Sequence, residues 1–152
     1  MLDAESGAKD SQDGGKLGDM MNLPKAVPEI PVSNVETAAE YYVSKLGFTF
    51  GWGDEKGGIG GIFNSECRLF LTNAEFRRWN GTSGPPIVIW LNLDSKAEVD
   101  ELFQQWRDAG AKILSEPEDK PYLLREFTAA DLDGNHIRVF HDFHWDVEQK
   151  EA

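Results

Sequence analysis

The sequence is poor in cysteine and in long apolar runs, and both absences exclude classes of protein. Cys67 is the single cysteine among 152 residues, so no internal disulfide can form and the chain suits a reducing cytoplasm. No apolar run approaches the roughly 20 residues that a membrane-spanning helix needs. Residues 1–19 contain no apolar segment like that of a signal peptide. We therefore expect a cytoplasmic protein that has no membrane partner.

Basic residues are scarce as well. The chain carries 15 lysines and arginines against 27 aspartates and glutamates, which gives a formal net charge of −12. Such a charge repels the phosphates of nucleic acids, so we expect no nucleic-acid partner. It attracts cationic small molecules, although solubility alone is also a sufficient reason for an acidic surface.

Composition divides the chain into a central domain and two ends. Residues 1–22 are rich in glycine, aspartate, serine and lysine and show no periodicity, which predicts a flexible N-terminal tail. A regular pattern of apolar residues occupies 23–144, and we expect a single domain there. Residues 145–152 are predicted to form a C-terminal tail.

Two similar series of elements follow each other within this domain. Asn34 and Ser95 are good N-caps for helices that end near Gly47 and Gly110. Each predicted helix follows one strand and precedes three strands. The predicted strands are 27–32, 48–52, 60–63, 68–72, 87–93, 112–114, 124–130 and 135–143. The order strand, helix and three strands therefore occurs twice, which indicates an internal repeat with modules at about 26–73 and 86–143.

The segment between the modules is predicted to be a long loop. Residues 73–86, NAEFRRWNGTSGPP, exceed the usual loop length of about 4–6 residues, so we expect a lid or a dimer contact. The glycines of GGIGG (57–61) lack the spacing of a phosphate-binding loop. They indicate instead a strand where backbone approaches closely.

Three segments carry a resemblance to a known family. IPVSNVETAAEYYVSKLGF (30–48), IVIWLNLDS (87–95) and REFTAADLDGNHIRVF (125–140) resemble the vicinal-oxygen-chelate superfamily, which includes glyoxalases, dioxygenases and bleomycin-resistance proteins. The bleomycin-resistance branch looks most similar. The resemblance implies an α+β fold in which two βαβββ modules form curved mixed sheets around a cleft, with the helices outside. It also implies a homodimer whose clefts sequester a cationic drug, as in antibiotic resistance, without chemistry on it.

The metal ligands of the related enzymes have no counterpart here. The resemblance places those four positions at Val27, Phe70, Val88 and Arg138. Valine and phenylalanine have no donor atom, and a guanidinium is a permanent cation without a lone pair to give. We therefore expect no metal and no other cofactor, and this favours a protein that is not an enzyme.

The alternation of side chains along strands indicates which residues line the cleft instead. Side chains two residues apart share a face, so Val88 is accompanied by Trp90 and Asn92, and Arg138 by His136. Arg138 is then either a hydrogen-bond donor to a ligand or a salt-bridge partner across the sheet. An aromatic ring at Tyr122 either stacks on a ligand or covers the core. The predicted ligand-binding residues are Trp90, Asn92, Phe70, Arg68, Tyr122, Phe127, Arg138 and Phe140.

Three hypotheses of function remain. The first is a homodimeric binding protein that sequesters an amphipathic aromatic molecule, cationic ones included, in an aromatic cleft. The second is a lyase, isomerase or dioxygenase-like enzyme of the same superfamily with a non-standard metal or none, in which His136 is the candidate general base. The third is a structural or regulatory dimer whose cleft is filled by its own core.

Overall fold

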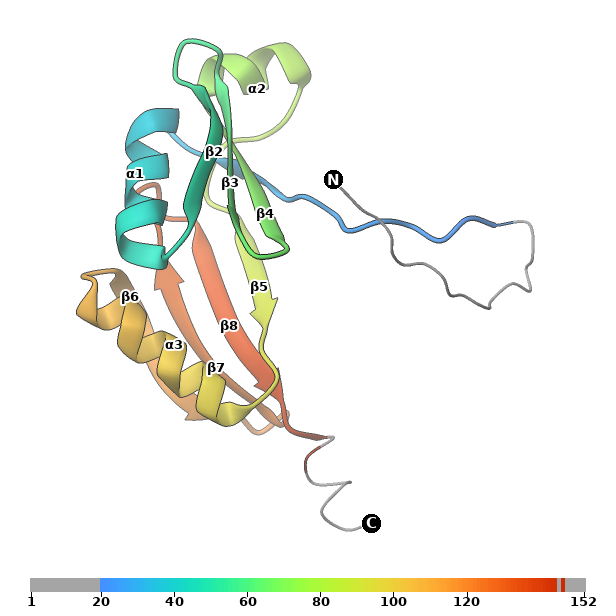
Figure 1. Cartoon of the computed structure of the whole chain (residues 1–152), viewed down its shortest axis with the longest axis vertical. Coiled ribbons are helices and arrows are strands. Elements are labelled where there is room, and N and C mark those ends of the chain that lie inside the picture. The colour runs from blue at the N-terminus through green and yellow to red at the C-terminus, as the bar shows by residue number, and fades with distance from the viewer. Residues whose placement is uncertain (1–19, 145, 147–152) are drawn as a thin grey trace.

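The computed structural model describes residues 20–144 and 146. In this part of the chain, two four-stranded mixed sheets are accompanied by three helices (Figure 1). The elements in chain order are β1 (Glu29–Pro31), α1 (Val35–Leu46), β2 (Thr49–Asp54), β3 (Ile59–Asn64), β4 (Cys67–Thr72), α2 (Ala74–Asn80), β5 (Val88–Asn92), α3 (Lys96–Asp108), β6 (Lys112–Asp119), β7 (Leu124–Ala130) and β8 (His136–Asp142).

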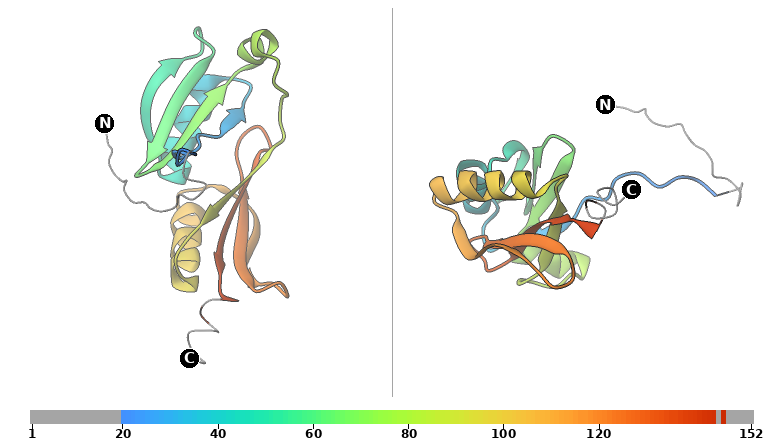
Figure 2. Two further views of the ribbon diagram at one scale, coloured as in Figure 1. Left: turned by 90° about the vertical axis from the view of Figure 1, so that its right-hand side faces the viewer. Right: turned by 90° about the horizontal axis from the view of Figure 1, so that it is seen from below.

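The two sheets repeat one topology. The N-terminal sheet has the strand order β1-β4-β3-β2 and the C-terminal sheet the order β5-β8-β7-β6. In each sheet the first strand of the module runs parallel to the last, and the other pairs are antiparallel. The predicted α+β fold of two βαβββ modules is thus confirmed. The two sheets lie one beyond the other along the long axis and do not close into a barrel (Figures 1 and 2).

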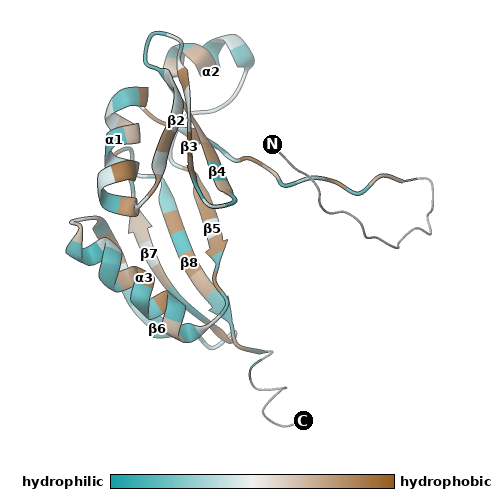
Figure 3. Ribbon diagram, viewed as in Figure 1, coloured by the Kyte–Doolittle hydropathy of each residue, from teal (hydrophilic) through white to brown (hydrophobic). Residues whose placement is uncertain are grey.

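One helix packs on each sheet and leaves the opposite face open. The predicted N-cap of α1 is confirmed, because the side chain of Asn34 accepts a hydrogen bond from the Thr37 backbone N–H, and Gly47 ends the helix at φ 79°. Helix α3 buries its apolar side against β7, where the rings of Phe103 and Trp106 lie 5.4 and 5.6 Å from that of Phe127. Figure 3 shows that the outward side of α3 is mostly hydrophilic.

The segment between the modules contains a helix where a loop was predicted. Asn73 caps α2 by accepting a hydrogen bond from the Phe76 backbone N–H, and Gly81 ends it at φ 76°. The helix has only 7 residues, which is too short for a periodic apolar pattern to show in the sequence.

A turn near the C-terminus joins the two modules. The side-chain amide of Asn135 donates to the Pro31 carbonyl oxygen at 2.8 Å, and its oxygen accepts from the Ile87 backbone N–H at 2.9 Å. Asp131 accepts a hydrogen bond from the Tyr42 hydroxyl at 2.9 Å. Burial, together with the charge of Asp131, raises the pKa of Tyr42. We call Tyr42, Asp131 and Asn135 the joint, because their buried and partly buried hydrogen bonds connect α1, β1, the residue before β5 and the turn before β8.

Candidate ligand-binding surfaces

The open face of the C-terminal sheet carries an aromatic pair. Strands β5 and β8 place Trp90 opposite Arg138 and Asn92 opposite Phe140, so these side chains share a face. The rings of Trp90 and Phe140 lie edge to face with their centroids 5.5 Å apart. Trp90 is 44% exposed, so part of its indole is accessible to a ligand.

An ion pair accompanies these rings. The guanidinium carbon of Arg138 lies 4.3 Å from the centre of the Trp90 ring. The same guanidinium binds the carboxylate of Glu126, which also accepts a hydrogen bond from the Tyr122 hydroxyl at 3.0 Å. Glu126 is only 2% exposed, and such a carboxylate needs partners of this kind. Of the two predicted roles for Arg138, the salt bridge across the sheet is present.

Glu126 itself was not predicted from the sequence. It lies opposite Phe140 in the antiparallel pair of β7 and β8, and therefore on the same face. Applying the alternation of side chains to β7 identifies it, since its neighbour Phe127 points the other way.

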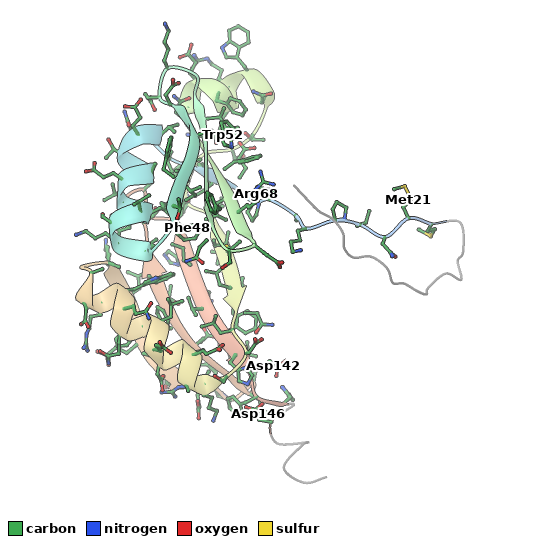
Figure 4. The ribbon with its side chains drawn as sticks, in the orientation of Figure 1. Met21, Phe48, Trp52, Arg68, Asp142 and Asp146 are labelled. Atoms are coloured by element: carbon green, nitrogen blue, oxygen red, sulfur yellow. The ribbon has the colours of Figure 1, made fainter. Side chains whose placement is uncertain are left out.

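The open face of the N-terminal sheet repeats the arrangement. The rings of Trp52 and Phe70 lie edge to face at 5.5 Å, and the Arg68 guanidinium carbon is 5.8 Å from the Phe70 ring centre. Figure 4 shows Trp52 and Arg68 along this sheet. The sequence signal is the pattern Arg-x-Phe, which occurs in the last strand of each module, at 68–70 in β4 and 138–140 in β8.

A glycine creates space for the Trp52 ring. A Cβ atom on Gly61 would lie 2.4 Å from the indole nitrogen of Trp52, so the indole rests directly on the glycine backbone. The sequence predicted a close approach of backbone at GGIGG, whereas at Gly61 it is the Trp52 side chain that approaches. A hollow of about 180 Å³ lies here, lined by Gly51, Trp52, Gly61, Ile62, Phe63, Arg68 and Phe70.

Phe127 was wrongly predicted to bind a ligand. Its side chain is 0% exposed and belongs to the hydrophobic core between β7 and α3. Tyr122 is half-exposed, and its hydroxyl donates a hydrogen bond to Glu126. Arg68, Phe70, Trp90 and Phe140 lie on open faces, together with Asn92 and Arg138.

A larger hollow runs beside the edge strand β5. It has a volume of about 440 Å³, within the range of ligand pockets. Trp90 and Asn92 belong to its wall, so it adjoins the open face of the C-terminal sheet. Cys67 is half-buried in the same wall, and burial raises the pKa of its thiol. The remaining lining residues are Leu46, Phe48, Asn64, Ser65, Glu66, Leu91, Leu93, Leu102 and Trp106.

The residues at the expected metal positions do not fit a divalent cation. Phe70 and Val88 present hydrocarbon, and Arg138 presents a guanidinium that is already paired with Glu126. Among residues 20–144 and 146, no group of three or more His, Cys, Asp or Glu side chains is arranged to hold a metal ion. His136 is exposed at the first residue of β8. No hydrogen bond to another described side chain orients its imidazole.

Comparison with known proteins identifies the family. Residues 24–139 match the family described as Glyoxalase/Bleomycin resistance protein/Dioxygenase superfamily. This match spans most of the chain, and the protein belongs to that superfamily. No curated protein matches the sequence.

Solved structures of low sequence identity share the fold. One is a glyoxalase/bleomycin resistance protein/dioxygenase from Nocardioides, with 22% identity over 80% of this chain and 85% of the other, at a TM-score of 0.65. TioX from Micromonospora sp. ML1 is 17% identical over 78% and 99% of the two chains, at a TM-score of 0.62. A bleomycin-binding protein from bleomycin-producing Streptomyces verticillus, solved with copper(II)-bleomycin, is 22% identical over 79% and 97%, at a TM-score of 0.60.

We also compared the described helices with the length and hydropathy that a membrane-spanning helix needs. None of them in residues 20–144 and 146 is long and apolar enough to cross a bilayer.

Proposed function

We propose that this protein is a small-molecule binding protein that sequesters a planar, amphipathic aromatic compound without reacting with it. The observation that carries this proposal is the repeated set of one tryptophan, one phenylalanine and one arginine on the open face of each sheet. In each pair an exposed tryptophan packs edge to face with a partly buried phenylalanine, so the indole offers an aromatic surface for stacking and the polar groups beside it give orientation.

We further propose that the binding unit is a cytoplasmic homodimer. Within one chain the sheets lie end to end, so each open face is only one wall of a site. Placing the N-terminal sheet of one copy against the C-terminal sheet of another would enclose a ligand between two aromatic pairs. A protein of similar fold binds bleomycin, which supports a ligand-binding role for this fold; the arrangement of two copies is our proposal.

The test is a fluorescence titration of the purified protein with planar aromatic compounds. Binding should quench the tryptophans, and Trp90→Phe and Trp52→Phe should each weaken it about tenfold, or about 1.4 kcal/mol. Trp79→Phe is the matched control, because this residue is 79% exposed on α2 and lines neither of the two hollows described above. Equal losses in all three variants, or no quenching by any compound, would contradict the proposal.

Native mass spectrometry of the untagged protein tests the assembly. We expect a dimer that carries a co-purified organic molecule and no stoichiometric metal. One divalent metal ion per chain would favour the enzyme hypothesis instead. In that case His136→Ala should abolish turnover without affecting the stability of the fold.

A further inference from the structure

The hollow on the N-terminal sheet has a positive charge and no negative one. Seven residues line it, and Arg68 is the ionisable one among them. Its guanidinium carbon lies 5.8 Å from the Phe70 ring centre. In the described part of the chain, Arg68 makes no ion pair and no side-chain hydrogen bond. Its five N–H donors are therefore available to a ligand.

The arginine on the C-terminal sheet, Arg138, differs from Arg68 because its charge is neutralised by an ion pair. Arg138 is paired with the buried carboxylate of Glu126, so the two charges cancel at that face. The two open faces share their aromatic groups, but only the N-terminal one offers an uncompensated cation beside its rings.

The charge next to the rings decides which ligands are accepted. The net charge of −12 acts at long range and is screened beyond about 8–10 Å at physiological salt. A ligand group that contacts Arg68 in the hollow interacts with the guanidinium charge at short range, where screening is weak. A cationic group placed there would be repelled, whereas a carboxylate would form a charge-assisted, two-pronged pair.

We propose that the hollow binds the acidic end of an aromatic ligand, so that the bound compound is an aromatic carboxylate whose ring packs against Trp52 and Phe70 and whose carboxylate pairs with Arg68. This inference rests on the proposed function and specifies the chemistry of its ligand. Trp52 supplies one wall because Gly61 leaves room for the indole. The carboxylate and ring of such a ligand are coplanar, which suits a guanidinium held beside a ring.

The experiment compares three probes that share a naphthalene ring and differ in charge. They are the anion 2-naphthoate, the neutral 2-naphthamide and the cation 2-naphthylmethylammonium. Calorimetric titration of the full chain should show 2-naphthoate binding at least about tenfold more tightly than the ammonium compound. Arg68→Met should reduce 2-naphthoate affinity about tenfold and leave 2-naphthamide affinity unchanged. Arg78→Met removes the same charge from an exposed position on α2 and should change neither affinity.

The outcomes separate this inference from the proposed function. If the ammonium compound binds most tightly, or if charge makes no difference, the anionic ligand is excluded and the binding function stands. If 2-naphthoate is preferred equally in Arg68→Met, the anion binds elsewhere and the assignment to Arg68 is wrong. If none of the probes binds, this inference fails, and the fluorescence titration with other planar aromatic compounds decides separately whether the proposed function stands. Thermal unfolding of each variant shows whether lost binding reflects lost folding.

Discussion

Arg138 and Glu126 hold opposite charges on a face that is otherwise aromatic. A carboxylate that is 2% exposed pays a large desolvation cost, which the guanidinium and the Tyr122 hydroxyl offset. The Nε atom of Arg138 is also buried and has no hydrogen-bond partner among the described residues. Because desolvation offsets most of the attraction between the two charges, we expect this pair to add little net stability to the fold, while it holds both side chains in place on this face.

Single and paired substitutions should behave very differently at this position. Arg138→Met leaves the Glu126 charge buried without a partner, and we expect a loss of about 3 kcal/mol in the free energy of unfolding. The combination Glu126→Gln with Arg138→Met removes both charges and should cost less than half as much. Urea unfolding measures all the variants. A double variant as unstable as the sum of the singles would contradict the pairing.

At the scale of elements, strand β3 depends on its glycines. Gly61→Ala should destabilise the protein by about 2 kcal/mol, because the new methyl group must displace the Trp52 indole from the sheet. Gly84→Ala is the control, since its Cβ would meet the Arg77 side chain only at 3.7 Å, an ordinary contact. Denaturant unfolding measures the stability of each variant, and the tryptophan emission of the folded state reports a change in the surroundings of the Trp52 ring. Identical behaviour of the two variants would show that Trp52 does not rest on Gly61.

The end of β8 contains a pH-sensitive contact. His141 is buried, and one ring nitrogen lies 3.0 Å from the Leu93 carbonyl oxygen and the other 2.9 Å from the Asp146 carboxylate. Burial opposes protonation of the ring, but the hydrogen bonds to Asp146 and Leu93 and the charges of Asp146 and Asp142 outweigh it. The pKa of His141 is therefore raised above its ordinary value.

A group whose pKa is raised by folding stabilises the folded state when it is protonated. The contribution of His141 is thus complete below about pH 6.5 and is lost as the pH rises through the higher pKa of the folded state. Asp146→Asn should lower the melting temperature by about 1–3 °C at pH 6 and by less at pH 9. Glu40→Gln, an exposed change of the same charge on α1, is the control. A pH-independent effect of Asp146→Asn would contradict the pairing.

The sequence predicted these elements unevenly, for physical reasons. Strong local signals, such as the Asn34 cap and the Gly47 end of α1, were found because capping depends on neighbouring residues. Helix α2 was missed because seven residues do not establish a period. The face of Phe127 was misjudged because the alternation in β7 was not applied to it. Glu126 was missed for the same reason, because the alternation in β7 places it on the face opposite to that of Phe127.

At the scale of the whole molecule, the joint holds the two modules in one orientation. Asn135 contacts β1, the residue before β5 and Asp131 through its side chain. Asn135 lies in REFTAADLDGNHIRVF (125–140), one of the segments that carry the family resemblance, and its structural role is to connect the two modules. The sequence alone did not reveal it, because the partners lie up to 104 residues away.

Asn135→Ala should therefore affect both modules. Removing the side chain leaves the Pro31 carbonyl and the Ile87 N–H without partners in a buried place, and we expect a loss of about 3 kcal/mol. Hydrogen exchange should show that the two sheets open at different free energies in the variant and together in the parent. Asn80→Ala, on the exposed surface of α2, should change neither quantity. Cooperative unfolding of Asn135→Ala at parental stability would show that the joint does not couple the modules.

The two aromatic faces have the same kinds of residue but place them differently, so the two faces offer different surroundings to a ligand. Trp52 comes from the outer strand β2 of its sheet, whereas Trp90 comes from the first strand of its module, and only one of the two arginines is neutralised. A guest lying between two such surfaces meets a different environment at each end. An elongated compound with two different ends would consequently be bound in one orientation, and a positional isomer with its ends exchanged would bind more weakly.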